Sequence, residues 1–233
     1  MLILNKNILT IGGNRLEGGH LTPPEPPGPG PLPPVPINTV RVRTSDGNVP
    51  VKATNTSYET ATLVSGTTDI YDVYKSGDSF YNLLYQSTNV IEVLDVNTTG
   101  IITMSWTFSH CTSLTSVPLF DTSNVTNMDH MFYGCTALKS VPLFNTSNVT
   151  DMSSAFNGCT SLKSVPLFDT SKVRFMSRML YNCTNVESGA LALYQQASSQ
   201  VTPPSNHNKT FNNCGSNTTT GAAELAQIPS DWK

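Results

Sequence analysis

The feature of this sequence that most limits its fold is a 24-residue pattern that recurs between residues 93 and 186. Each repeat holds one methionine and, further along, one cysteine. The methionines are Met104, Met128, Met152 and Met176, and the cysteines are Cys111, Cys135, Cys159 and Cys183. A unit of this size cannot bury its apolar face alone, so neighbouring units must pack against one another. The sequence therefore predicts a repeat architecture.

Other apolar residues keep the same register in every repeat. They are Phe108, Phe132, Phe156 and Leu180, then Leu114, Leu138, Leu162 and Val186, and finally Ile101, Val125, Val149 and Val173. The spacing predicts a short strand around Leu-x-Ser-Val and a short helix through Val-Thr-x-Met-x-x-x-Phe. A turn with Asp121, Asn145 or Asp169 would join them and cap the helix. We therefore expect an α/β solenoid of about four 24-residue rungs.

The full pattern is Asp-Thr-Ser-Asn-Val-Thr-x-Met-x-x-Met-Phe-x-x-Cys-x-x-Leu-x-Ser-Val-Pro-Leu-Phe. It resembles the BspA-like branch of leucine-rich repeats, which occurs in surface proteins of bacteria and protists and in some bacteriophage proteins. The resemblance covers about 90 of the 233 residues. It implies adhesion or ligand display, with the strands on one face of the solenoid and the short helices on the other.

Changes in composition divide the chain into five predicted parts. Residues 1–21 form a β-strand attachment segment with one or two short strands, and residues 22–36 are a linker that holds nine of the sixteen prolines. Because proline fixes φ and donates no hydrogen bond, we expect an extended spacer there. Residues 37–92 form a β-rich N-terminal cap, residues 93–186 the leucine-rich repeat solenoid, and residues 187–233 a helical C-terminal cap.

The two caps carry local signals of their own. In the N-terminal cap, Val40 and Val42 alternate with polar residues before Asp46-Gly47, which predicts a hairpin that returns through Val49 and Val51. In the C-terminal cap, residues 188–198 and 220–227 predict two helices, with Thr220 as the N-cap of the second. These helices would cover the open end of the repeat core.

Composition and charge exclude several classes of protein. Charged residues make up 12% of the chain and its net charge is −3, so no basic stripe can neutralise nucleic-acid phosphates. The apolar run from Ile8 to Ile11 is too short for a signal peptide or a membrane span. We therefore expect no nucleic-acid partner, no membrane insertion and no export signal.

The cysteines and histidines suggest no catalytic or metal site. Cysteines that are one full repeat apart lack the close pairing of zinc ligands, and packing in the core is favoured over disulfides or metal binding. Cys214 falls outside the register, and His207 is expected to be a solvated loop residue. No Ser-His-Asp or Cys-His set can be assembled. We expect a protein that is not an enzyme and has no cofactor.

Ligand binding is best sought where the repeats vary. The position two residues after each methionine holds Trp106, His130, Ser154 and Arg178, while its neighbours stay constant. Exposed tryptophan and arginine often anchor contacts, so Trp106, His130 and Arg178 are the main candidate ligand-binding residues. The adjacent Tyr133, Tyr181, Arg174 and Phe175 complete the set. The alternative is that all seven are solvated surface positions.

The ends of the chain suggest where the protein works. A repeat typical of surface adhesins without a predicted export signal fits a bacteriophage virion protein, because virions assemble in the cytoplasm. The segment LNKNILTIGGNRL is similar to short attachment tags of phage head and tail appendages. We therefore expect a fibre, tail tip or capsid decoration that joins other virion proteins through residues 1–36 and contacts a host surface glycan or protein. A homotrimer would fit this layout. The alternative is a bacterial BspA-like cell-surface adhesin.

Overall fold

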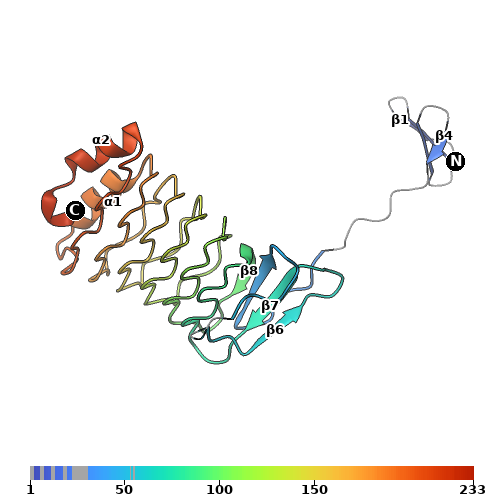
Figure 1. Cartoon of the computed structure of the whole chain (residues 1–233), viewed down its shortest axis with the longest axis horizontal. Coiled ribbons are helices and arrows are strands. Elements are labelled where there is room, and N and C mark those ends of the chain that lie inside the picture. The colour runs from blue at the N-terminus through green and yellow to red at the C-terminus, as the bar shows by residue number, and fades with distance from the viewer. Residues whose placement is uncertain are drawn as a thin grey trace. The chain divides into compact units, whose positions relative to one another are not determined.

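The computed structural model describes residues 3–5, 8–11, 14–17, 20–22, 31–52, 54 and 56–233. It contains two compact units, Met1–Pro33 and Pro34–Lys233, and each is treated separately below (Figure 1). Most of the predicted proline-rich spacer, residues 23–30, lies outside the described residues. No helix in the described part of the chain is long and apolar enough to cross a membrane.

The first unit contains four short strands where one or two were expected. They are β1 (Ile3–Asn5), β2 (Ile8–Ile11), β3 (Asn14–Glu17) and β4 (His20–Thr22). The strands pair in sequence order, and every pair is antiparallel. The register places Leu4 opposite Leu9, Leu9 opposite Leu16, and Leu16 opposite Leu21. The residues of this segment therefore form a small meander.

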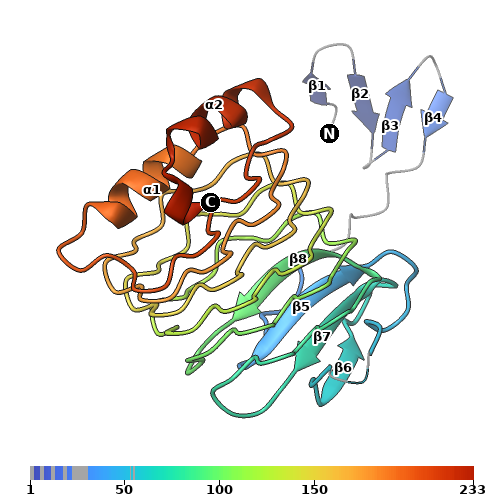
Figure 2. The ribbon, with the colours of Figure 1, turned by 60° about the vertical axis from the view of Figure 1, so that its left-hand side comes forward.

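The second unit begins with another antiparallel sheet, of strands β5 (Thr39–Thr44), β6 (Thr60–Leu63), β7 (Ile70–Tyr74) and β8 (Val90–Asn97). Their order across the sheet is β6-β7-β5-β8. Val40 and Val42 of β5 are completely buried, as is Val73 of β7. The sheet lies at one end of this unit, and the C-terminal helices lie at the other (Figure 2).

The hairpin predicted around Asp46-Gly47 is wrong. Strand β5 pairs with β7 and β8, while residues 49–51 form no strand and both Val49 and Val51 are exposed. Hydrogen bonds to the side chain of Asn89 take the place of the expected pairing between strands. Its Nδ2 donates to Asp46 Oδ1 at 3.0 Å, and its Oδ1 accepts from the Val51 N–H at 2.8 Å. These bonds hold the 45–51 segment as a loop.

Residues 98–188 are built from turns joined by backbone hydrogen bonds between repeats. In the segment that begins at each methionine, every second N–H donates to a carbonyl of the next repeat, at 2.6–3.0 Å. The N–H groups of Met104, Trp106 and Phe108, for example, donate to Asn127, Asp129 and Met131. Of the N–H groups between them, the first bonds to a side-chain oxygen two residues back, as Ser105 does to Thr103 Oγ1, and the others bond three residues back within the same turn, as Thr107 does to Met104. Successive repeats therefore lie side by side (Figures 1 and 2).

The α/β solenoid of about four 24-residue rungs is a wrong prediction. The strands of the described residues belong to the two antiparallel sheets, and the α-helices are two short ones near the C-terminus. Within residues 98–188, pairing is limited to isolated parallel bridges such as Thr103–Asn127, and no helix forms. The cause is a left-handed residue in every repeat: Trp106, His130, Ser154 and Arg178 have φ of 59°, 54°, 53° and 55°. A right-handed helix cannot continue through this conformation.

A second left-handed position follows four residues after the first. It is occupied by His110, Gly134, Gly158 and Asn182, with φ of 59°, 70°, 75° and 59°. The helix-capping role predicted for the Asx residues is also wrong, because they close local turns instead. Asp121 Oδ1 accepts from the Ser123 N–H at 2.8 Å, and Asp169 Oδ1 accepts from the Ser171 N–H at 2.8 Å.

The core of the repeat region is made of matching columns of side chains. Phe132 is completely buried, and its ring stacks between those of Phe108 at 5.3 Å and Phe156 at 5.6 Å. Buried threonines link adjacent repeats beside the rings. Thr122 Oγ1 donates to the Asn145 carbonyl and Thr146 Oγ1 to the Asp169 carbonyl, both at 2.8 Å. Hydrogen bonds from buried threonines to the next repeat therefore lie beside the stacked phenylalanine rings.

The C-terminal segment contains helices α1 (Ala190–Ser198) and α2 (Thr219–Gln227) and a 3₁₀ turn, η1 (Ser230–Trp232). The two predicted helices are present. The N-cap of α2 is Thr218, which accepts from the Gly221 N–H, and not Thr220 as predicted.

The hydrogen-bond pattern of the repeats runs further along the chain than predicted. The Met152 N–H donates to the Phe175 carbonyl, one residue before the next methionine. The Met176 N–H donates in the same way, but its acceptor is the carbonyl of Asn206. One further unit, lengthened by an insertion, therefore follows the last 24-residue repeat, and it is called the inserted-loop unit below.

The phenylalanine column should dominate the stability of the repeat region. We expect Phe132→Ala to lower the free energy of unfolding by about 3–5 kcal/mol, because it leaves a cavity between two stacked rings. The matched control is Leu143→Ala, which shortens a side chain that is 59% exposed and should cost less than about 0.5 kcal/mol. Urea unfolding followed by circular dichroism measures both. Equal losses would contradict this account of the core.

Candidate functional site

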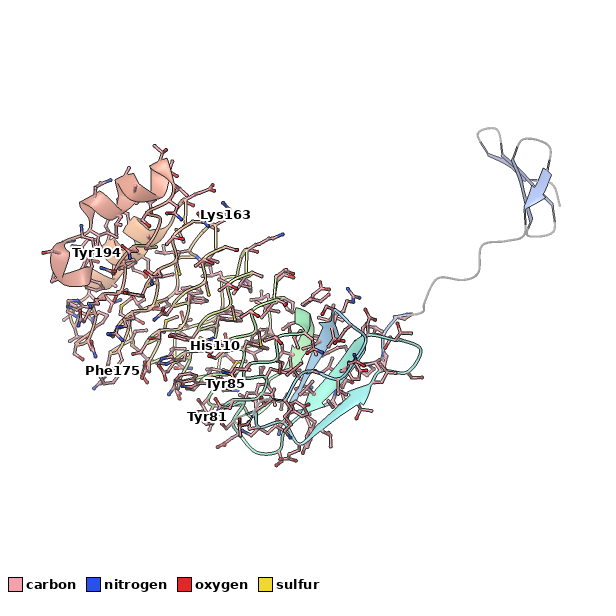
Figure 3. The ribbon with its side chains drawn as sticks, in the orientation of Figure 1. Tyr81, Tyr85, His110, Lys163, Phe175 and Tyr194 are labelled. Atoms are coloured by element: carbon pink, nitrogen blue, oxygen red, sulfur yellow. The ribbon has the colours of Figure 1, made fainter. Side chains whose placement is uncertain are left out.

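Five ring side chains meet on one side of the repeat region. Tyr85, Trp106, His110, His130 and Tyr133, hereafter the aromatic cluster, are all half-buried. The Trp106 and His130 rings are stacked, with centroids 4.0 Å apart and planes 6° apart. Tyr133 lies 5.2 Å from His130 and 5.0 Å from His110. Figure 3 shows Tyr85 and His110 on the same side of the molecule, opposite Lys163 in that view.

The backbone of the repeats brings these rings together. Trp106 and His130 occupy the same left-handed position in adjacent repeats, and the hydrogen bonds between repeats set the spacing of their side chains. Bulky residues rarely adopt this conformation, and such strain is often found at functional sites. His110 lies over Gly134, where an added Cβ would come within 2.7 Å of its Nδ1. The glycine thus leaves room for the imidazole.

Polar groups border the rings. His130 Nδ1 lies 2.5 Å from Asp129 Oδ1, and Ser105 Oγ lies 3.5 Å from the other oxygen of that carboxylate. Burial, and then the positive charge of protonated His130, lowers the pKa of His110 below its usual value. The aromatic cluster therefore offers flat apolar faces beside hydrogen-bonding groups, which is the composition of many ligand sites.

The structure brings together three of the seven sequence-predicted residues, Trp106, His130 and Tyr133. Arg178, Tyr181, Arg174 and Phe175 belong to later parts of the repeat region, and no ring contact in the described part of the chain joins them to the cluster. Ser154, in the same column as Trp106, is buried. The predicted column therefore does not form one continuous surface: Trp106 and His130 belong to the cluster, Ser154 is buried, and Arg178 lies outside the cluster.

Sequence reasoning missed two members of the aromatic cluster. His110 lies in the second left-handed column, where two of the other repeats have glycine and no side chain to suggest a surface site. Tyr85 precedes the recognised repeats, yet the Phe80 N–H already donates to the Thr103 carbonyl, just as Met104 donates to the next repeat. Tyr85 follows Phe80 by five residues, as Tyr133 follows Met128. Extending the register back by one repeat would have found it.

The cysteines are free and buried, as the core-packing interpretation predicted. The Sγ of Cys135 donates to the Phe108 carbonyl at 3.0 Å, and Cys159 makes the same bond to Phe132 at 3.1 Å. Burial raises the pKa of Cys111 to about 12 and also that of Cys214 to about 12. Cys214 occupies the cysteine position of the inserted-loop unit, since its N–H bonds to the Phe211 carbonyl as Cys183 bonds to Leu180. These thiols are core groups.

His207 also differs from its prediction as a solvated loop residue. Its ring is half-buried and stacks on Trp232 with centroids 4.1 Å apart. The contact belongs to the packing between the inserted-loop unit and the C-terminal turn. Among the described residues, no group of three or more histidine, cysteine or carboxylate side chains could hold a metal ion.

A separate cavity of about 460 Å³ lies near the C-terminal end of the repeats. The residues that line it are Thr150, Ser171, Lys172, Val173, Arg174, Thr202, Pro203 and Ser205. It includes Arg174 from the predicted set, together with a second cation and four hydroxyl side chains. This cavity shares no residue with the aromatic cluster.

Fold and site together define a protein of turn-built 24-residue repeats that carries an aromatic surface cluster. Residues 102–221, more than half of the chain, match the family described as Mycoplasma protein of unknown function, DUF285. The chain belongs to this family, and the match links it to the BspA-like repeats that its sequence resembles. No curated protein and no solved structure matches the chain.

The lowered pKa of His110 gives a testable prediction. The neutral imidazole is the favoured form, so its contribution to stability is complete above pH 6.5, the ordinary pKa, and is lost as the pH falls through the lower pKa of the folded state. We expect NMR titration to place the pKa of His110 below 6.5. His130→Gln should raise it by removing one of its two causes, while Lys139→Gln, which removes a charge outside the cluster, should not. A pKa at or above 6.5 would contradict the burial of this ring.

Proposed function

We propose that this chain is a non-enzymatic display protein that binds a neutral surface glycan through its aromatic cluster. The stacked pair Trp106 and His130 is the observation that carries the proposal. Rigid aromatic rings provide a large contact area at low conformational cost, and their flat faces suit the apolar faces of sugar rings. Asp129, which touches His130, would accept hydrogen bonds from sugar hydroxyls.

Low surface charge supports a neutral ligand at the aromatic cluster. Only 12% of the residues are charged. The Asp129 carboxylate that borders the rings is in hydrogen-bond contact with His130 Nδ1, at 2.5 Å. The repeats also allow the surface residue to vary without changing the core, since Trp106, His130 and Arg178 share one backbone conformation. A constant core with variable surface residues is typical of repeat proteins used for binding.

For the location, we propose a bacteriophage virion surface, with residues 1–36 attaching the chain to other virion proteins, as a homotrimer. The alternative is a bacterial cell-surface adhesin, and the family description, which names a bacterial genus, favours it. Immunogold labelling separates the two, because the label would lie on particles in the first case and on cells in the second.

The binding proposal predicts a loss of affinity on Trp106→Ala. We expect glycan-array binding to identify a neutral glycan, and calorimetry to show an affinity at least about tenfold weaker for the variant. Phe175→Ala is the matched control, because Phe175 is 44% exposed but lies outside the cluster. Equal binding by Trp106→Ala and the parent chain would overturn the proposal, as would binding to a protein receptor with no glycan.

A further inference from the structure

The cavity beside Arg174 results from the one irregular spacing in the described repeats. The Met176 N–H donates to the Asn206 carbonyl. In the equivalent bonds of the earlier methionines, the acceptor lies fewer residues further along the chain. The additional residues include Thr202 and Pro203, which line one side of the cavity, while Ser171 and Lys172 line it from the preceding repeat. An insertion thus creates a hollow that a regular repeat would not contain.

Both sides of the cavity are fixed to the backbone of Arg174. Its carbonyl accepts from the Asn206 N–H at 3.1 Å and from Ser205 Oγ at 3.2 Å. Its own N–H donates to the Thr150 carbonyl at 2.9 Å. The cavity of about 460 Å³ is therefore held by hydrogen bonds on both sides. Its size lies within the range of roughly 300–1,000 Å³ that is usual for small-ligand sites.

The cavity is positively charged. Lys172 and Arg174 both line it, and among the described residues the Arg174 guanidinium has no ion-pair partner. Lys172 Nζ donates to Asn148 Oδ1 at 2.7 Å, and its positive charge also acts on the nearby Asp169 carboxylate, so Arg174 carries most of the unbalanced charge of the cavity. Between Asp169 and Glu224 the sequence has one carboxylate, Glu187, which is paired with Lys163 at 2.9 Å.

We propose that this cavity binds an acidic sugar residue, whose carboxylate or sulfate pairs with Arg174 and Lys172. A guanidinium can bind either anion through two parallel hydrogen bonds, which an ammonium group cannot do. The hydroxyls of Ser171, Thr150, Thr202 and Ser205 line the same space and suit the hydroxyls of a sugar ring. The choice of a saccharide rests on the proposed function, whereas the anion site rests on the cavity alone.

The test is titration calorimetry of the full chain with four probes. They are the α-methyl glycoside of N-acetylneuraminic acid, a sulfated heparin disaccharide, lactose and inorganic sulfate. We expect at least one acidic saccharide to bind and Arg174→Gln to weaken it at least tenfold, while any binding of lactose should be the same in Arg174→Gln and the parent chain. The two acidic probes distinguish a carboxylate from a sulfate as the recognised group.

Controls separate this site from general charge and from the aromatic cluster. Lys139→Gln makes the same change of charge at an exposed residue outside the cavity and should leave binding unchanged. Trp106→Ala should also leave it unchanged, so failure of the aromatic site would not affect this result. Equal losses in Lys139→Gln and Arg174→Gln, or no binding of either acidic saccharide, would overturn the proposal. Inorganic sulfate binding as tightly as the saccharides would overturn the assignment to a sugar.

Discussion

The backbone hydrogen bond from one repeat to the next is the interaction on which the rest of the structure depends. It uses every second N–H of the segment that begins at each methionine, and the N–H groups between them are satisfied inside the turn. A right-handed helix would direct all of these donors along its own axis. Two left-handed residues per repeat, such as Trp106 and His110, turn alternate N–H groups toward the neighbouring repeat. Because these bonds fix the spacing of repeats, they also fix the spacing of the side chains.

Both candidate sites follow from that spacing. Where the spacing is regular, equivalent residues of adjacent repeats face one another, and Trp106 meets His130 with ring centroids 4.0 Å apart. Where an insertion interrupts it, the chain opens a cavity beside Arg174. The aromatic cluster offers the apolar faces of its rings, while the cavity is lined by two cationic side chains and four hydroxyl side chains.

The sequence predicted the columns of the repeat but not their backbone. Buried positions such as Phe132 and Cys135 follow directly from the 24-residue register, because side-chain volume must match between neighbours. The left-handed conformation at Trp106 and Arg178 could not be predicted, since these side chains carry no signal for positive φ, whereas Gly134, Gly158 and Asn182 at the second position do carry one. The loop around Asn89 depends on side-chain bonds between residues that are distant in the sequence. The sequence predicted three members of the aromatic cluster; Tyr85 lies before the recognised repeats, and His110 lies outside the variable column that contains Trp106 and His130.

The most direct test of the central claim is the measurement of scalar couplings across hydrogen bonds by NMR. The account predicts couplings from the amide nitrogens of Met104, Trp106 and Phe108 to the carbonyl carbons of Asn127, Asp129 and Met131. It also predicts a coupling within the turn from Thr107 to Met104. Couplings from each of these nitrogens to the carbonyl four residues earlier would show a helix in every repeat and contradict the account.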